Sequence, residues 1–169
     1  IRDRFYTRPI EVTISSETPD AAIRYTTDGR EPTPQFGQIY TGPIRITSTT
    51  VLRAIAYKSG MIQTNVDAKS YLYAGDIIQQ REMDSSIVGS PIYSREIRPA
   101  LTRLPVVSLS FNPTDVFGGS GIHSNPSLSG TSSEREAHFE FFDPSDPEDS
   151  THEPAGIRIH GGNARQHPK

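Results

Sequence analysis

The sequence predicts a mainly β chain in two parts: an N-terminal β-sandwich, then a short helical connector and a partial α+β segment. Apolar and polar residues alternate in short runs through the first part, as they do in strands with one buried face. The 14 Pro and 13 Gly residues end regular elements early. A hydrophobic content of 33% favours two small units with shallow cores over one large domain.

The N-terminal domain is predicted over residues 1–74. Its alternating runs are expected to form short strands over 10–14, 22–27, 43–47, 50–58 and 67–73. Asp28-Gly29 is a strong turn signal, and Pro32 predicts a loop over 30–37. Asp28 could be a ligand or a catalytic carboxylate, but an aspartate beside a turn glycine is more typical of a side chain that caps its own turn.

A set of short segments in this domain keeps a characteristic order and spacing. The segments are Glu-Thr-Pro at 17–19, Ile-Arg-Tyr-Thr-Thr-Asp-Gly at 23–29, Pro-Thr at 32–33, Tyr40, Pro-Ile at 43–44, Leu-Arg-Ala at 52–54 and Ala-Tyr at 56–57. Together they resemble the chitobiase/β-hexosaminidase C-terminal type of domain. The resemblance implies an immunoglobulin-like sandwich that serves as an accessory module of a large secreted or cell-surface bacterial protein. It implies a fold rather than an activity.

Five tyrosines of this domain are candidates for stacking against sugar rings, which would make it a carbohydrate-binding module. They are Tyr25, Tyr40, Tyr57, Tyr71 and Tyr73. The alternative interpretation is that they are half-buried strand residues whose hydroxyl groups reach polar partners. The alternation of the strands favours this second interpretation.

Residues 75–103 are predicted to connect the two parts through short helices. A short helix is expected over 74–83 and a loop over 85–94, where Gly89 and Pro91 break regular structure. Ser94 is a candidate N-cap for a helix over 95–104, although Pro99 falls inside that range. Because proline lacks the N–H that a helix interior needs, this helix is expected to begin near Pro99 or to kink there.

Residues 104–169 are predicted to begin a second domain. Strands are expected over 105–111, 134–142 and 155–160, with an acidic, proline-bearing loop over 143–154. Asn112-Pro113 predicts the start of a single helical turn over 113–117. Glu140 and Asp143 flank the end of the second strand. A paired acid/base role is not favoured for them, because nothing in the sequence indicates burial.

Several segments of this part have the order of a second family. They are Leu104-Pro105, Asp-Val-Phe-Gly at 115–118, Gly-Ile-His at 121–123, Glu-Phe-Phe-Asp at 140–143, Gly-Ile-Arg-Ile-His-Gly-Gly at 156–162, Arg165 and Pro168-Lys169. They resemble the opening of the CotH (spore coat protein H) family. The resemblance implies a kinase-like fold that binds ATP and a divalent metal such as Mg²⁺ and phosphorylates protein serines.

The resemblance covers only the first part of that family's domain, whose metal-binding and catalytic aspartates would follow Lys169. The chain begins with Ile1 rather than Met, so it is expected to be processed or to be a piece of a longer protein. We therefore expect a non-catalytic fragment without a cofactor of its own. Enzymatic activity, as an atypical protein kinase that uses ATP and Mg²⁺, is expected only of the full-length parent.

The candidate phosphate contacts are Gly161, Gly162, Arg165 and Lys169. An arginine holds phosphate through two parallel hydrogen bonds, a lysine binds it as a point charge, and two glycines let the backbone approach a nucleotide closely. The alternative interpretation is a hairpin turn with two solvated cations, and the sequence leaves both open.

Charge and composition exclude several classes of protein. The net charge of −3 and the scattered basic residues argue against a nucleic-acid partner. The chain has no Cys, which excludes disulfides, and no apolar run of the roughly 20 residues that span a bilayer. The five histidines and the acidic group at 146–149 lack the spacing of zinc and calcium sites, so no metal or catalytic residue is predicted.

The expected partners are other domains of the same parent protein and assembly partners that pair with exposed sheet edges. A structural or adhesive role in an extracellular or cell-surface assembly is the main alternative to the kinase. Carbohydrate binding by residues 1–74 is a further alternative. In each case the predicted location is secreted, at the bacterial cell surface or in the periplasm.

Overall fold

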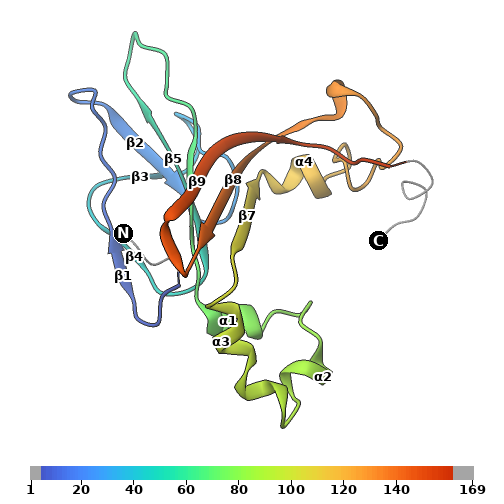
Figure 1. The fold of residues 1–169 in the computed structure, drawn as a ribbon. Coiled ribbons are helices and arrows are strands. Elements are labelled where there is room, and N and C mark those ends of the chain that lie inside the picture. The colour runs from blue at the N-terminus through green and yellow to red at the C-terminus, as the bar shows by residue number, and fades with distance from the viewer. Residues whose placement is uncertain (1–4, 162–169) are drawn as a thin grey trace.

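The computed structural model describes residues 5–161, apart from the side chains of 147–149, and it is mainly β as the sequence predicts. The strands form three antiparallel sheets, and a group of short helices connects two of them (Figure 1). Among the described residues, no helix has both the length and the apolar character needed to cross a membrane.

Six short strands build the N-terminal part. One sheet pairs β1 (Ile10–Val12) with β4 (Ile44–Ile46). The other has the order β3-β2-β5-β6 and contains β2 (Ala22–Thr26), β3 (Gln38–Ile39), β5 (Thr50–Tyr57) and β6 (Asp67–Tyr71). The sequence predicts all of these strands except β3, whose two residues are too few to alternate.

The third sheet has the order β7-β8-β9 and contains β7 (Val106–Phe111), β8 (Arg135–Asp143) and β9 (Asp146–Ile157). The prediction of a loop over 143–154 is wrong, because β8 and β9 form a hairpin there. Asp143 caps its turn: the carboxylate accepts the N–H of Ser145 at 2.8 Å and its hydroxyl at 2.7 Å. Pro154 is tolerated within β9 because an edge strand leaves every second N–H outside the ladder.

The core of the N-terminal sandwich lies between its two sheets. Its buried members come from both sheets and from the segment after β6: Val12, Ile44, Ile46, Leu52, Tyr71 and Tyr73. The hydroxyl of Tyr73 lies 2.9 Å from the carbonyl oxygen of Ile46 and 3.1 Å from that of Arg8. Burial raises the pKa of Tyr73, so the hydroxyl keeps its proton and acts as a donor.

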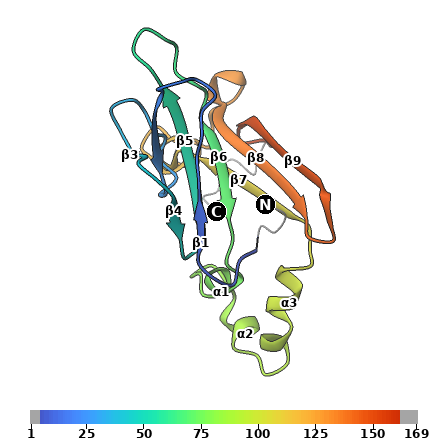
Figure 2. The same ribbon diagram turned by 90° about the vertical axis from the view of Figure 1, so that its left-hand side faces the viewer.

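The β3-β2-β5-β6 sheet is covered on both faces. Leu52 and Tyr71 point into the sandwich core, so their strand neighbours Arg53 and Ser70 point to the opposite face. Arg53 and Ser70 are nevertheless only 1% exposed. The β7-β8-β9 sheet lies along this side of the molecule, next to β6 (Figure 2).

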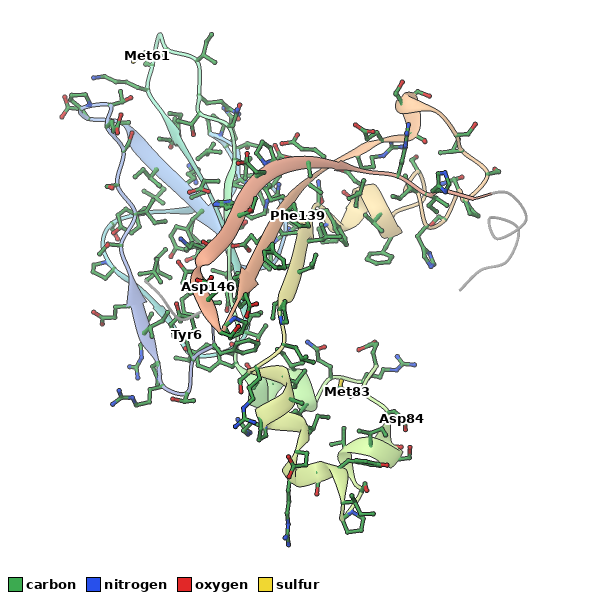
Figure 3. All side chains as sticks on the ribbon, viewed as in Figure 1. Tyr6, Met61, Met83, Asp84, Phe139 and Asp146 are labelled. Carbon is green, nitrogen blue, oxygen red and sulfur yellow. The ribbon has the colours of Figure 1, made fainter. Side chains whose placement is uncertain are left out.

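The connector contains α1 (Ala74–Ile78), α2 (Ser85–Val88), a 3₁₀ turn (Tyr93–Arg95) and α3 (Ile97–Leu101). The prediction of a loop over 85–94 is wrong at α2, which Asp84 caps by accepting the N–H of Ser86 at 2.8 Å. Pro99 is the third residue of α3, where a helix has no acceptor for an N–H. Asp84, in the connector, and Met61, at the tip of the β5–β6 loop, lie at opposite ends of the molecule (Figure 3).

Two further helical turns flank the third sheet. The predicted turn after Asn112 is confirmed as α4 (Pro113–Phe117), and the side chain of Asn112 accepts the N–H of Thr114 at 3.3 Å. A 3₁₀ turn (Thr131–Ser133) precedes β8.

Candidate functional site

Of the four predicted phosphate contacts, the structure describes Gly161 alone, which follows β9 after residues 158–160. Gly161 is the last described residue, and its φ of 115° belongs to a backbone region that favours glycine. Gly162, Arg165 and Lys169 lie outside the described residues. The structure therefore does not test whether these four residues meet, and their role stays a prediction.

The carboxylates and histidines of the described residues are not arranged as a metal site: no three of them are placed to hold one ion. Glu140 and Asp143 also do not form an acid/base pair. The hydrogen bonds from Ser145 lower the pKa of Asp143, which belongs to the hairpin turn. Glu140 is turned toward the sandwich and is 1% exposed, a burial that the sequence does not indicate.

A shallow hollow on the outside of the sandwich is lined by Tyr25, Asp28, Arg30, Phe36 and Gln38. Its polar groups are paired with one another. Arg30 forms an ion pair with Asp28 at 2.6 Å, and its guanidinium lies 4.5 Å from the ring centre of Phe36. Asp28 also accepts the N–H of Arg30, which confirms its predicted role as a turn cap. The hydroxyl of Tyr25 donates to the side-chain oxygen of Gln38 at 3.0 Å.

The tyrosine hydroxyls support the interpretation as half-buried strand residues. Tyr40 accepts the N–H of Ile14 at 3.1 Å, and Tyr57 accepts the side-chain Nε–H of Arg24 at 3.3 Å. Tyr71 and Tyr73 are buried. These contacts assign the tyrosines to the packing of the sandwich, and carbohydrate binding by residues 1–74 stays a prediction.

The most unusual group of side chains lies between the sandwich and the β7-β8-β9 sheet. We call it the buried polar layer. Its members are no more than 5% exposed and come from β5, β6, β7 and β8: Arg53, Ser70, Ser110, His138 and Glu140.

Ser70 and Glu140 connect the two parts directly. The N–H of Ser70 donates to Oε2 of Glu140 at 2.8 Å, and the hydroxyl of Ser70 lies 2.7 Å from that of Ser108. Because β6 is the last strand of its sheet, the Ser70 N–H is free of the β5 ladder and can reach a side chain. Glu140 therefore closes part of an otherwise open sheet edge.

Arg53 lies in the same layer as a buried cation. Its Nη1 donates to the carbonyl oxygen of Gly29 at 3.0 Å, and no carboxylate of the described residues forms an ion pair with it. Burial lowers the pKa of Arg53, while the charges of Glu31, Glu136 and Asp115 act in the opposite direction. The ordinary pKa of arginine is above about 12, so the group stays charged at neutral pH.

His138 faces this cation from the other sheet. Burial lowers the pKa of His138, and the positive charge of Arg53 lowers it further. Its ring centre is 6.4 Å from that of His152, whose Nε2 lies 3.4 Å from the carboxylate of Asp67. The described pockets are not lined by any member of this layer, so no substrate-sized cavity is associated with it among the described residues.

By its fold, the described part of the chain is a β-sandwich whose outer face is covered by a second antiparallel sheet. Residues 2–77 match the family model of the chitobiase/beta-hexosaminidase C-terminal domain, which confirms the first resemblance for this part of the chain. No curated protein and no solved structure matches the chain. The resemblance of residues 104–169 to the CotH family gains no support from these comparisons and stays a prediction.

The buried polar layer is not among the sites predicted from the sequence. Polar strand residues such as Arg53 and His138 are expected on the solvent side of a two-layer sandwich. A usable signal is present in β5, where Val51 and Ile55 flank Arg53 on one face while Leu52 occupies the other. A strand that is apolar on both faces indicates a sheet that is covered twice.

Proposed function

We propose that the N-terminal sandwich is a non-catalytic accessory domain of immunoglobulin-like type that holds the β7-β8-β9 sheet in a fixed position. The observation that carries this proposal is the buried polar layer. A module that moves on a flexible linker would present this face to water. Here Arg53, Ser70 and Glu140 are each 1% exposed.

The energy of these contacts favours a permanent junction. Separation of the sheets would take the N–H of Ser70 away from a charged acceptor, a bond worth about 1.5–3 kcal/mol. It would also expose Ile55, which is 2% exposed on the same face as Arg53. Burial of a side chain of this size contributes about 1.5–3 kcal/mol.

Cleavage of the connector tests the proposal in the full chain. A protease site is inserted between Arg81 and Glu82, which are exposed and lie between α1 and α2. After cleavage, the two pieces are expected to elute together in gel filtration without denaturant. A matched sample with Glu140→Ala is expected to release more of the C-terminal piece. Complete separation of the wild-type pieces would show that the sandwich is an independent module.

For the full-length parent we propose a secreted or surface-located protein kinase of the CotH type. This second candidate rests on the resemblance of residues 104–169 and on Gly161, whose backbone favours glycine in the segment that follows β9. The parent is incubated with labelled ATP and Mg²⁺, and label is expected on serine. Arg165→Ala and Lys169→Ala are expected to abolish the transfer, whereas Arg158→Ala, at an exposed position, leaves it intact.

Absence of label transfer in the parent would exclude this activity and leave the structural role. In that case the open edges of β3 and β9 would be the sites for pairing with other chains, and ordered filaments would be expected by electron microscopy.

A further inference from the structure

Three polar atoms of the buried polar layer have no hydrogen-bond partner among the described residues. They are Nε of Arg53, Oγ of Ser110 and Nε2 of His138. The three residues are 1%, 5% and 4% exposed, respectively, so bulk water does not reach them. Buried polar groups in folded proteins almost always have a partner, either in the protein or in an ordered water. Three such atoms in one layer indicate a ligand between them.

The strand register brings these atoms together. Ser110 of β7 is directly opposite His138 of β8, so their β-carbons lie on one face about 4.5–5.5 Å apart. Arg53 approaches from β5, across the gap between the sheets. Its Nη1 donates to the carbonyl oxygen of Gly29 at 3.0 Å, and Gly29 packs against the backbone of Phe111, the residue after Ser110 in β7. The positive charge of Arg53 also lowers the pKa of His138.

We propose that an ordered water molecule enclosed between the sheets bridges Arg53, Ser110 and His138. A buried water makes about three hydrogen bonds to groups that are otherwise unsatisfied, which is the number of atoms available here. The Nε–H of Arg53 donates to the water oxygen. The hydroxyl of Ser110 and the neutral ring of His138 can each donate or accept, so the remaining two bonds can be completed.

Charge favours water over an anion at this position. The charges of Glu31, Glu136 and Asp115 already stabilise the charged guanidinium of Arg53. Glu140 also lies in the layer, two residues from His138 along β8. A negative ion would be repelled by these groups, whereas a neutral water satisfies the polar atoms without adding charge. This hydration site goes beyond the proposed support role and adds a bridge from β5 to β7 and β8.

Water-to-amide cross-relaxation in the ¹⁵N-labelled full chain tests the proposal. A long-lived water contact is expected at the amides of Ser110 and His138. The contact is expected to disappear in Ser110→Ala. Ser108→Ala is the matched control on the same strand, because the hydroxyl of Ser108 is hydrogen-bonded to that of Ser70 rather than to the proposed water. This control is expected to leave the water contact unchanged.

The direction of the change in stability gives a second, independent readout. A bridged Ser110 loses a hydrogen bond in Ser110→Ala, so the urea midpoint is expected to fall. If no water lies in the layer, the urea midpoint of Ser110→Ala is expected to rise, because the substitution removes a buried hydroxyl that has no hydrogen-bond partner. A raised midpoint, or no water contact in the wild type, overturns the proposal. A wild-type midpoint that increases with chloride, an effect absent in Arg53→Met, would identify an anion and would also overturn it.

Discussion

Ser70 and Glu140 are separated by 70 residues, yet the backbone N–H of Ser70 donates to Oε2 of Glu140 at 2.8 Å in the buried interior of the molecule. The donor belongs to the last strand of the sandwich sheet and the acceptor to the middle strand of the third sheet. This bond forms only when the two sheets pack together. Its contribution to stability therefore reports on the packing between the sandwich and the β7-β8-β9 sheet, rather than on either part alone.

Glu140→Ala is expected to lower the free energy of unfolding by about 2–4 kcal/mol, because it removes a charged acceptor and leaves a buried N–H unpaired. Glu140→Gln keeps a carbonyl oxygen for Ser70 and is expected to cost less, about 1 kcal/mol. Urea unfolding measures both. Glu153→Ala, at an exposed position of β9, is the control and is expected to change stability by less than about 0.5 kcal/mol. Equal effects of Glu140→Ala and Glu153→Ala would contradict the role of this bond.

Gly37 is required by the close approach of the backbone between β2 and β3. Its φ is 106°, and a β-carbon there would lie 2.8 Å from the carbonyl oxygen of Tyr25. Because that oxygen is part of the backbone, it cannot rotate away. Gly37→Ala is expected to destabilise the chain by about 2–3 kcal/mol, as judged by thermal unfolding.

The matched control for this substitution is Gly42→Ala. Gly42 has open space where a β-carbon would be placed, and its φ lies outside the region that favours glycine. The control is expected to be neutral or slightly stabilising, by about 0.4–1 kcal/mol, because alanine restricts the unfolded chain. Similar losses at both positions would show that the contact with Tyr25 is not the cause.

Tyr73 connects the sandwich core to β4 through the hydrogen bond from its hydroxyl to the carbonyl oxygen of Ile46. Tyr73→Phe removes the hydroxyl that faces the carbonyl oxygens of Ile46 and Arg8, and is expected to cost about 1–2 kcal/mol. Tyr57→Phe removes a longer bond, at 3.3 Å from Arg24, on a more exposed tyrosine and is expected to cost less. A larger loss for Tyr57→Phe in chemical unfolding would contradict this order.

The strands of the sandwich could be predicted because a half-buried strand alternates, and β4 follows that rule, with Arg45 exposed between buried Ile44 and Ile46. The hairpin partner β9 could not, because its prolines and acidic residues are those of a loop and only its edge position makes them acceptable. The buried polar layer was not predicted either, although the apolar residues on both faces of β5 indicate that its sheet is covered twice. The burial of Arg53, His138 and Glu140 depends on a second sheet that arrives from elsewhere in the chain, and alternation within one strand does not show which face is covered.

The junction is expected to weaken in mild acid through His138. Burial and the charge of Arg53 lower the pKa of His138 in the folded state, whereas the unfolded chain has the ordinary value of 6.5. Below that value the unfolded state binds a proton that the folded state resists, so the stabilisation is complete above about pH 6.5 and is lost as the pH falls. Asp67 and Glu136 oppose this shift, whereas His152 reinforces it.

The substitution His138→Gln tests this pH dependence, because glutamine stays neutral. It is expected to flatten the dependence of unfolding free energy on pH between about 5.5 and 7.5, by at most about 1.4 kcal/mol per pH unit. His152→Gln, a partly exposed neighbour, is the control and is expected to keep most of the slope. If His138→Gln and the wild type show the same slope, the folded-state His138 is not held neutral by the layer.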